Sequence, residues 1–370
     1  MSIVQPAETQ SDASLEVTVD KDAAKEARKE KIFTAINKAS KFLDAVGLSW
    51  VTPLLMIAAG DSPKEQGKAL WMRLGVPILA LLIFMFAWAQ LAPTVKTSLG
   101  AIPGPSQVWE QAVVLHKDHV AEKVKSDAFY ARQDARNDAL IAAGREGEVR
   151  DRDYTGKQTY YQQIWTSLKT VFFGFILATV IAAPLGIIMG MSPAMSAAFN
   201  PIIQIFKPVS PLAWLPIVTM VVSATVATDG NMSKSFLTSA ITVTLCSLWP
   251  TLINTAVGVA SIDKDLVNVG KVLKLDAWTK VTKLVLPSAL PLIFTGMRLS
   301  LGVGWMVLIA AEMLAQNPGL GKFVWDEFQN GSSQSLAKIM VAVLTIGIIG
   351  FILDRFMAAL QTMFTHSTNR

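Results

Sequence analysis

The sequence predicts an all-α integral membrane protein with about six transmembrane helices. Of its 370 residues, 52% are hydrophobic and 16% are charged, and the mean hydropathy is positive. Soluble domains carry about 25% charged residues. The apolar residues gather into runs of about 20, the length that crosses a bilayer core of about 30 Å. Lys and Arg flank these runs unevenly, and this asymmetry predicts their orientation.

Six apolar runs are long enough to span a membrane. We place them at residues 73–91, 170–191, 212–227, 236–262, 292–314 and 337–360. Pro208, Pro211 and Pro216 crowd the third run, and each removes a backbone donor. Broken backbone at membrane depth must be covered by protein or by a water-filled cavity. We therefore expect this span to face the bundle interior or another subunit.

The remaining segments complete the expected organisation. It comprises a polar and basic tail at 1–40, an interfacial helix at 41–72, a first transmembrane helix at 73–92, a polar helical extracytoplasmic insertion at 93–163, a transmembrane core at 164–362 and a short tail at 363–370. No apolar core lies near Met1, so a cleaved signal peptide is not expected. A further span within 41–60 is the alternative to the interfacial helix. The insertion is either a solvated cap or a docking surface.

Charge placement predicts the topology. The flank before Arg73 and the segment 262–291 are rich in Lys, whereas the loops 228–235 and 316–334 carry one Lys each. The positive-inside rule puts the lysine-rich parts in the cytoplasm. With six spans, both termini and segment 262–291 are then cytoplasmic, and the insertion lies outside.

A charged insert, "NVGKVLKLDAWTKVTKLVLP", interrupts the apolar chain from Asn268 to Pro287. As a helix, residues 262–275 carry one apolar stripe formed by Ile262, Leu266, Val269 and Leu273. Asp276 can N-cap a second helix that ends at Pro287. One interpretation is a membrane-surface hairpin whose lysines meet anionic lipid. The other is a docking element for a cytoplasmic protein.

The insert resembles the cytoplasmic loop of type I ABC importer permeases. The signature of that loop is Glu-Ala-Ala, three residues, Gly, nine residues, Ile, one residue and Leu-Pro. Anchoring on Leu286 and Pro287 places Lys274 at the Gly and Asn268 at the Glu. A Lys in a left-handed turn is strained by roughly 1 kcal/mol. Either the turn differs, or Lys274 ends the first helix without that conformation, and the contact of the lost Glu must be supplied otherwise.

Two further stretches resemble the nitrate/sulfonate/taurine class of these permeases. They are "NPIIQIFKPVSPLAWLPI" and "LPSALPLIFTGMRLSLGVGWMVLIAAEML", and "NVGKVLKL" is most similar to the nitrate, cyanate and bicarbonate branch. The resemblance covers residues 161–361. It implies the type I ABC importer permease fold, and a subunit that imports nitrate or nitrite across a bacterial inner membrane. Taurine or another alkanesulfonate, cyanate and bicarbonate are the alternative solutes, and a receptor or scaffold without an ATPase is the alternative of another class.

The resemblance also implies partners and sites. The expected partners are cytoplasmic ABC ATPase subunits, a periplasmic or lipid-anchored substrate-binding protein and a second copy of the permease. The expected ATPase-coupling residues are Ile262, Asp265, Leu266, Asn268, Val269, Lys271, Leu273, Lys274, Asp276 and Lys280. Candidates for the translocation path are Lys207, Arg298, Trp305 and Glu312. Ionisable residues within spans are functional hypotheses by default.

Each path candidate also has a structural alternative. Arg298 could attract a small anion or be a structural arginine near the cytoplasmic edge. Lys207 could add positive potential or snorkel toward the interface. Glu312 is expected to bond between helices near the outer end, and Trp305 is more typical of packing. Asp354 and Arg355 are expected to form a structural pair.

Several chemistries are not predicted. No G-x-x-x-x-G-K-[ST] sequence is present, and "GLGKF" at 319–323 lacks the spacing and the hydroxyl residue. The chain is therefore not expected to be an ATPase or another enzyme, and ATP is expected on partner subunits, with no cofactor here. The single Cys246 excludes an internal disulfide framework. His116 and His119 share a helix face without a third ligand, so no metal site is expected, and nothing suggests nucleic-acid binding.

Overall fold

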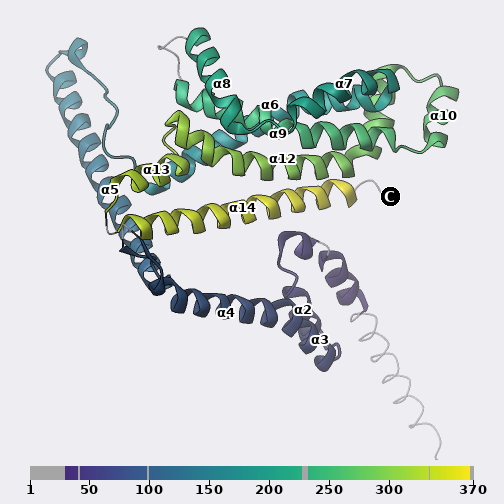
Figure 1. Cartoon of the computed structure of the whole chain (residues 1–370), viewed down its shortest axis with the longest axis horizontal. Coiled ribbons are helices and arrows are strands. Elements are labelled where there is room, and N and C mark those ends of the chain that lie inside the picture. The colour runs from purple at the N-terminus through teal and green to yellow at the C-terminus, as the bar shows by residue number, and fades with distance from the viewer. Residues whose placement is uncertain (1–29, 41, 98–99, 227–231, 333, 367–370) are drawn as a thin grey trace, which may run out of the picture. The chain divides into compact units, whose positions relative to one another are not determined.

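The computed structural model describes residues 30–40, 42–97, 100–226, 232–332 and 334–366 (Figure 1). The chain divides into two compact units. One comprises Met1–Phe84 with Ala358–Met363, and the other comprises Met85–Met357 with Phe364–Arg370. The described residues are helical apart from turns and one two-stranded ribbon, β1 (Lys96–Thr97) paired with β2 (Gly100–Ala101). This confirms the predicted fold class of an all-α membrane protein.

Five helices are long and apolar enough to cross a membrane. They cover Pro63–Thr94, Tyr160–Met191, Lys234–Ala260, Ala277–Ala315 and Ser335–Thr365. A bent helix pair raises the number to six if the pair is one span. These elements match five of the six predicted runs. Four of the runs lie wholly within them, whereas the helix at Lys234–Ala260 ends two residues before the end of the predicted run at 236–262.

The first unit is built from short helices that lead into a long one. α2 (Val51–Ala58) has only eight residues. α3 (Pro63–Leu70), the π-helical turn η1 (Trp71–Gly75) and α4 (Val76–Leu91) follow one another into the first candidate span, of which α4 continues into the second unit. A side chain at Gly75 would lie 2.3 Å from the Trp71 ring. Glycine therefore makes room for that ring at the π-helical turn.

The core of the second unit is a packed set of helices. α9 (Lys234–Ala260) packs against both α6 (Tyr160–Met191) and α12 (Leu286–Ala315) (Figure 1). Small residues recur every four positions along the α6 face toward α9, namely Gly174, Ala178, Ala182, Gly186 and Gly190. A Cβ on Gly186 would lie 2.8 Å from the Leu252 carbonyl oxygen, and one on Gly190 would lie 2.6 Å from that of Ala256. The two backbones therefore approach closely, as small-residue ladders allow in membranes.

The region of the predicted third span consists of two helices separated by a sharp bend. α7 (Pro193–Phe206) and α8 (Pro211–Thr225) meet at a bend of 99°. Pro208 and Pro211 flank the break, where a proline ring and its missing donor prevent helix continuation. Ser210 caps α8 by accepting from the Leu212 amide at 3.3 Å. α8 therefore covers most of the predicted run at 212–227, and the break that the prolines predicted lies just before it.

The polar insertion forms one long helix followed by an irregular return segment. α5 (Pro105–Ala142) has 38 residues. Gly104 is its N-cap residue, and Pro105 occupies its first turn. The Tyr154 hydroxyl donates to Glu122 at 2.9 Å. This bond lowers the pKa of Glu122 and raises that of Tyr154. The segment after α5 is thus tied back along the helix toward the start of α6.

Candidate functional site: the charged loop between α9 and α12

The charged loop folds as two helices around a tight turn. α10 (Lys264–Val272) begins at Asp263, whose side chain accepts from the Asp265 amide at 2.9 Å. The predicted helix at 262–275 was too long at both ends, because α10 starts at Lys264 and ends at Val272. Ile262 instead packs partly buried against a cluster containing Val259 and Val285. It was therefore wrong to include Ile262 in the stripe of the first helix.

The turn after α10 is left-handed, with Lys274 at φ 48°. The Leu275 amide donates to the Gly270 carbonyl at 3.1 Å, and the Lys274 amide donates to the Lys271 carbonyl at 3.0 Å. This is the Schellman arrangement, which normally places glycine in the left-handed position. Both alternatives expected for Lys274 were wrong. The turn keeps its left-handed geometry because its two hydrogen bonds satisfy helix-end carbonyls, which offsets the strain on a residue with a Cβ.

The second helix starts where predicted but does not stop at Pro287. The Asp276 carboxylate accepts from the Thr279 amide at 3.1 Å, which confirms the predicted N-cap of α11 (Ala277–Lys280). Hydrogen bonds from Thr279 also hold the pKa of Asp276 below its usual range. The chain then passes through a π-helical turn, η4 (Val281–Val285), into α12 without a break. A widened turn relieves the clash between a proline ring and the preceding turn, so Pro287 is tolerated.

Five large apolar side chains of the loop are exposed and do not line the cavity on its inner side. We call this set the outer face, and its members are Leu266, Val269, Val272, Leu273 and Trp278. Val272 is 80% exposed and Trp278 is 75% exposed. Sequence reasoning found three of the five and missed Val272 and Trp278. The signal for Trp278 was a tryptophan in a short polar segment just after a helix cap.

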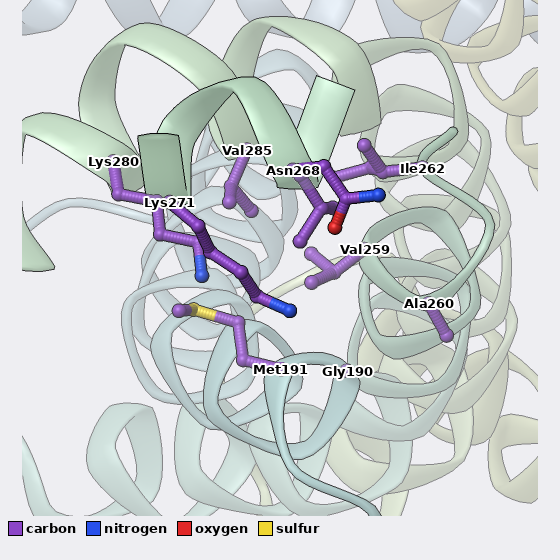
Figure 2. Close-up of a pocket in the computed structure, with 10 residues that line it drawn as sticks. Gly190, Met191, Val259, Ala260, Ile262, Asn268, Lys271, Lys280 and Val285 are labelled. Atoms are coloured by element: carbon purple, nitrogen blue, oxygen red, sulfur yellow. The ribbon is translucent and has the colours of Figure 1, made fainter. Parts of the chain in front are cut away.

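The opposite side of the loop borders a cavity of about 330 Å³. Its walls combine the loop with the last residues of α6 and α9, and they include Gly190, Met191, Val259, Ala260, Ile262, Asn268, Lys271, Lys280 and Val285 (Figure 2). Figure 2 shows the side chains of Lys271 and Lys280 reaching into this space toward Met191. The lysines and Asn268 thus line the inner side of the loop, while the apolar residues form its outer face.

Two path candidates share a second, smaller cavity. Arg298 and Trp305 both line a space of about 230 Å³ together with Asp354 and Gly350. The Arg298 guanidinium donates to both carboxylate oxygens of Asp354, with a distance of 2.8 Å for the Nη2 bond. Arg355 donates to the same carboxylate at 2.7 Å. Arg298 is therefore already neutralised by a bidentate ion pair between α12 and α14 (Ser335–His366).

Trp305 and Lys207 have different surroundings. The Trp305 side chain is buried, and its Nε1 donates to the Ile346 carbonyl at 3.0 Å. This bond fixes α12 against α14, as expected for a packing tryptophan. Lys207 is exposed and follows the last residue of α7, at the edge of the 99° bend.

Glu312 lies at the other end of α12 and is fully buried, with 0% exposure. The Ser167 hydroxyl lies 2.9 Å and 2.8 Å from its two carboxylate oxygens, and the Gly321 amide donates to it at 3.0 Å. Ser167 in turn accepts from the Leu320 amide at 2.8 Å. Glu312 and Ser167 therefore cap the start of α13 (Leu320–Asn330), whose own N-cap residue, Gly319, has no side chain to do so.

The two glycines of "GLGKF" are required by this contact. A Cβ on Gly319 would lie 2.1 Å from Glu312 Oε1, and one on Gly321 would lie 2.2 Å from the Ile309 carbonyl oxygen. Only glycine lets this backbone approach the carboxylate. Sequence reasoning predicted an interhelix role for Glu312 but missed Ser167, Gly319 and Gly321, which are distant from it in the sequence or look like turn residues.

Comparisons with known proteins agree with this arrangement. Residues 182–365 match the family described as "binding-protein-dependent transport system inner membrane component". The chain is 37% identical over 196 residues to a nitrate import permease of Synechococcus elongatus, covering 53% of this chain and 67% of that protein. It is 33% identical over 313 residues to a bicarbonate transport system permease of Synechocystis sp., covering 83% of this chain and 94% of that protein. The chain belongs to this family of permeases.

A third relative is named for a different kind of solute, an alkanesulfonate. The permease is 32% identical over 207 residues to the taurine transport system permease of Escherichia coli, covering 56% of this chain and 70% of that protein. Membership of the family makes the chain a multi-pass inner membrane subunit of an ABC importer, with ATPase and substrate-binding partners. It is a transport subunit and not a catalytic one, and the family implies no cofactor.

Proposed function

We propose that the permease imports nitrate or nitrite and that the charged loop is the element on which the ATPase acts. The outer face carries this proposal. Five large apolar side chains stand exposed on a short helix–turn–helix that its own hydrogen bonds hold in shape. Exposed apolar sets of this kind mark protein–protein contacts. The left-handed turn at Lys274 lies where the permease signature has its glycine, which further supports the assignment.

Nine of the ten predicted coupling residues divide into three groups under this proposal, and the tenth, Asp265, is exposed on α10 outside all three. Leu266, Val269 and Leu273 belong to the outer face and contact the ATPase. Asp276 and Lys274 shape the turn that presents this face. Ile262, Asn268, Lys271 and Lys280 lie toward the helix ends, where they transmit motion of the loop to α6 and α9.

The nitrate assignment rests on the nitrate-permease relatives and on the "NVGKVLKL" start of the loop. Bicarbonate is the second candidate, because the alignment with the bicarbonate permease covers 94% of that protein. An alignment of 313 residues necessarily extends into the part of the chain before α6, which begins at Tyr160. Both solutes are small singly charged oxyanions, so the same path can serve either. Taurine and cyanate are less well supported.

Topology and oligomeric state are part of the proposal. The charged loop and both termini lie in the cytoplasm, and α5 and α13 lie outside, if the bent pair counts as one crossing. Lys207, Pro208 and Ser210 at the bend are exposed within one chain. Backbone broken at membrane depth needs protein or a water-filled cavity around it. A second copy of the permease across the pore provides that cover and gives Lys207 a position beside the path.

Uptake of labelled solute tests the substrate. A strain lacking this chain and other nitrate carriers is complemented with the permease, and uptake of labelled nitrate and labelled bicarbonate is measured side by side. We expect nitrate uptake to be restored and bicarbonate uptake to stay unchanged. The Val269→Asp, Leu273→Asp variant, expressed to the same level, is the matched control and should restore neither. Restored bicarbonate uptake without nitrate uptake would transfer the assignment to bicarbonate.

A further inference from the structure

The cavity on the inner side of the charged loop contains positive charge without a counter-charge. Lys271 comes from α10 and Lys280 from α11, and both side chains reach into the same space (Figure 2). Among the described residues, neither ammonium group forms a hydrogen bond or an ion pair. Two ammonium groups that converge without an acceptor repel each other, and this arrangement favours a bound anion.

The acidic residues of the loop do not line this cavity. The carboxylate of Asp263 accepts from the Asp265 amide, and that of Asp276 accepts from the Thr279 amide. Both are therefore occupied as helix caps. Asp265 is exposed and lies outside the lining. The loop thus uses the carboxylates of Asp263 and Asp276 to cap its helices, and Lys271 and Lys280 have no ion-pair partner in the part of the chain that the structure describes.

The remaining walls suit an oxyanion at the membrane boundary. Met191, Val259, Ile262 and Val285 make one side apolar, and charge interactions are stronger beside an apolar wall than in bulk water. Asn268 adds an amide that can donate a hydrogen bond. A volume of about 330 Å³ holds an oxyanion with several waters, since one water occupies about 30 Å³. Basic pockets between transmembrane helices are also known to hold anionic headgroups.

We propose that this cavity binds an oxyanion of the phosphate or nitrate type, held by Lys271 and Lys280 with Asn268 as a further donor. The anion is either free in solution or the phosphate of an anionic lipid headgroup. Bound there, it bridges α10 and α11 beside the ends of α6 and α9. Binding of the anion does not depend on the proposed function. Only its consequence does, because the anion would set the position of the loop that the ATPase contacts.

The test uses the purified full-length chain in a neutral detergent. Its melting temperature is followed while chloride is replaced by nitrate or by phosphate at constant ionic strength. A ligand that binds only the folded state raises the melting temperature in a saturable way. We expect this rise for the natural chain. In the Lys271→Gln, Lys280→Gln variant, the anion concentration at half-maximal rise should be at least about tenfold higher, because one hydrogen bond to a charged group changes affinity by about that factor.

A second arm distinguishes the two sources. The same proteins are placed in discs of phosphatidylcholine alone or of equal parts phosphatidylcholine and phosphatidylglycerol. If the headgroup is the ligand, only the phosphatidylglycerol discs stabilise the natural chain, and the double variant loses that gain. Lys283→Gln is the matched control, because Lys283 is exposed on the same segment and lies outside the cavity. Lys280→Arg keeps the charge and should retain the response.

Two results would overturn the site. One is the absence of any anion or phosphatidylglycerol response that depends on Lys271 and Lys280. The other is an equal loss in Lys283→Gln, which would indicate general attraction to a basic loop. Co-isolation of the ATPase from the same preparations is a separate readout. A chain that retains the ATPase but shows no anion response refutes the site and leaves the proposed function intact.

Discussion

The two ends of α12 are built in opposite ways. At the Glu312 end, a fully buried carboxylate is held by Ser167 and by a backbone amide of α13, and glycines bring the chain against it. At the other end, the loop exposes Val272 and Trp278 and leaves Lys271 and Lys280 without partners among the described residues. At the first end, the buried polar groups form hydrogen bonds with one another. At the second end, the exposed apolar side chains and the two cavity lysines have no partner among the described residues.

The difference indicates which end is fixed and which end moves. Buried polar groups with complete hydrogen bonding lock helices into one arrangement, because any shift leaves an unsatisfied group. A loop that contacts its own chain through an open cavity can shift with less loss. We therefore interpret α6, α12 and α13 as anchored at the Glu312 end and the charged loop as the adjustable end.

The largest expected effect is at the anchored end. Glu312→Ala removes the carboxylate that caps α13, and it leaves the Ser167 hydroxyl without its acceptor and the Gly321 amide without a partner in a buried site. We expect the free energy of unfolding to fall by about 2–4 kcal/mol, seen as a lower melting temperature and a lower yield from membranes. Ser167→Ala, which leaves the carboxylate with its bond from Gly321, should cost less. A Glu312→Ala protein as stable as the natural chain would contradict the anchor.

The Arg298–Asp354 pair should give an intermediate effect. Arg298→Gln leaves Asp354 with Arg355 as its remaining charged partner. Both side chains of the pair are about one-third exposed, so we expect a loss of less than about 2 kcal/mol. Combining Arg298→Gln with Asp354→Asn should recover most of that stability.

Uptake by these variants separates the two roles of Arg298. If the residue is structural, the double variant transports solute at a rate close to that of the natural chain. If Arg298 contacts the anion, the double variant is stable and inactive. The ion pair in the structure leads us to expect restored transport, measured as labelled nitrate uptake at matched expression.

The smallest effect is expected at the turn of the loop. Lys274→Gly removes the Cβ that strains a residue at φ 48° and should stabilise the protein by about 1 kcal/mol. Lys274→Ala keeps the Cβ and should give no gain, so it serves as the control. The measurement is the melting temperature of the purified chain. Equal effects of the two substitutions would show that the charge of Lys274, and not its backbone, governs the turn.

Features that depend on local sequence could be predicted. Apolar runs identify membrane spans because each run must cross the bilayer by itself. Asp276 could be recognised as a helix cap because its partner, the Thr279 amide, is three residues away. The interhelix role of Glu312 follows from the cost of a carboxylate within an apolar span.

Features that depend on distant residues, or on a small balance between local energies, could not be predicted. Ser167 lies far from Glu312 in the sequence, and only the folded helices bring them together. Lys274 accepts a strained conformation because the hydrogen bonds around it outweigh the strain. The helix continues through Pro287 because a π-helical turn precedes it, and no residue pattern in "VTKLVLP" indicates such a turn. The prolines predicted a break near the third span, but its angle of 99° depends on where α7 and α8 pack.

Retention of the ATPase by loop variants tests the central claim most directly. Membranes containing the tagged permease and its ATPase are solubilised, and the amount of ATPase that co-isolates is measured. We expect Val269→Asp, Leu273→Asp to reduce it at least about tenfold, because charge in an apolar contact removes its main binding energy. The control Ser261→Asp, Lys283→Asp adds two acidic residues outside the outer face and should retain the ATPase. Normal retention by the Val269→Asp, Leu273→Asp variant would contradict the account.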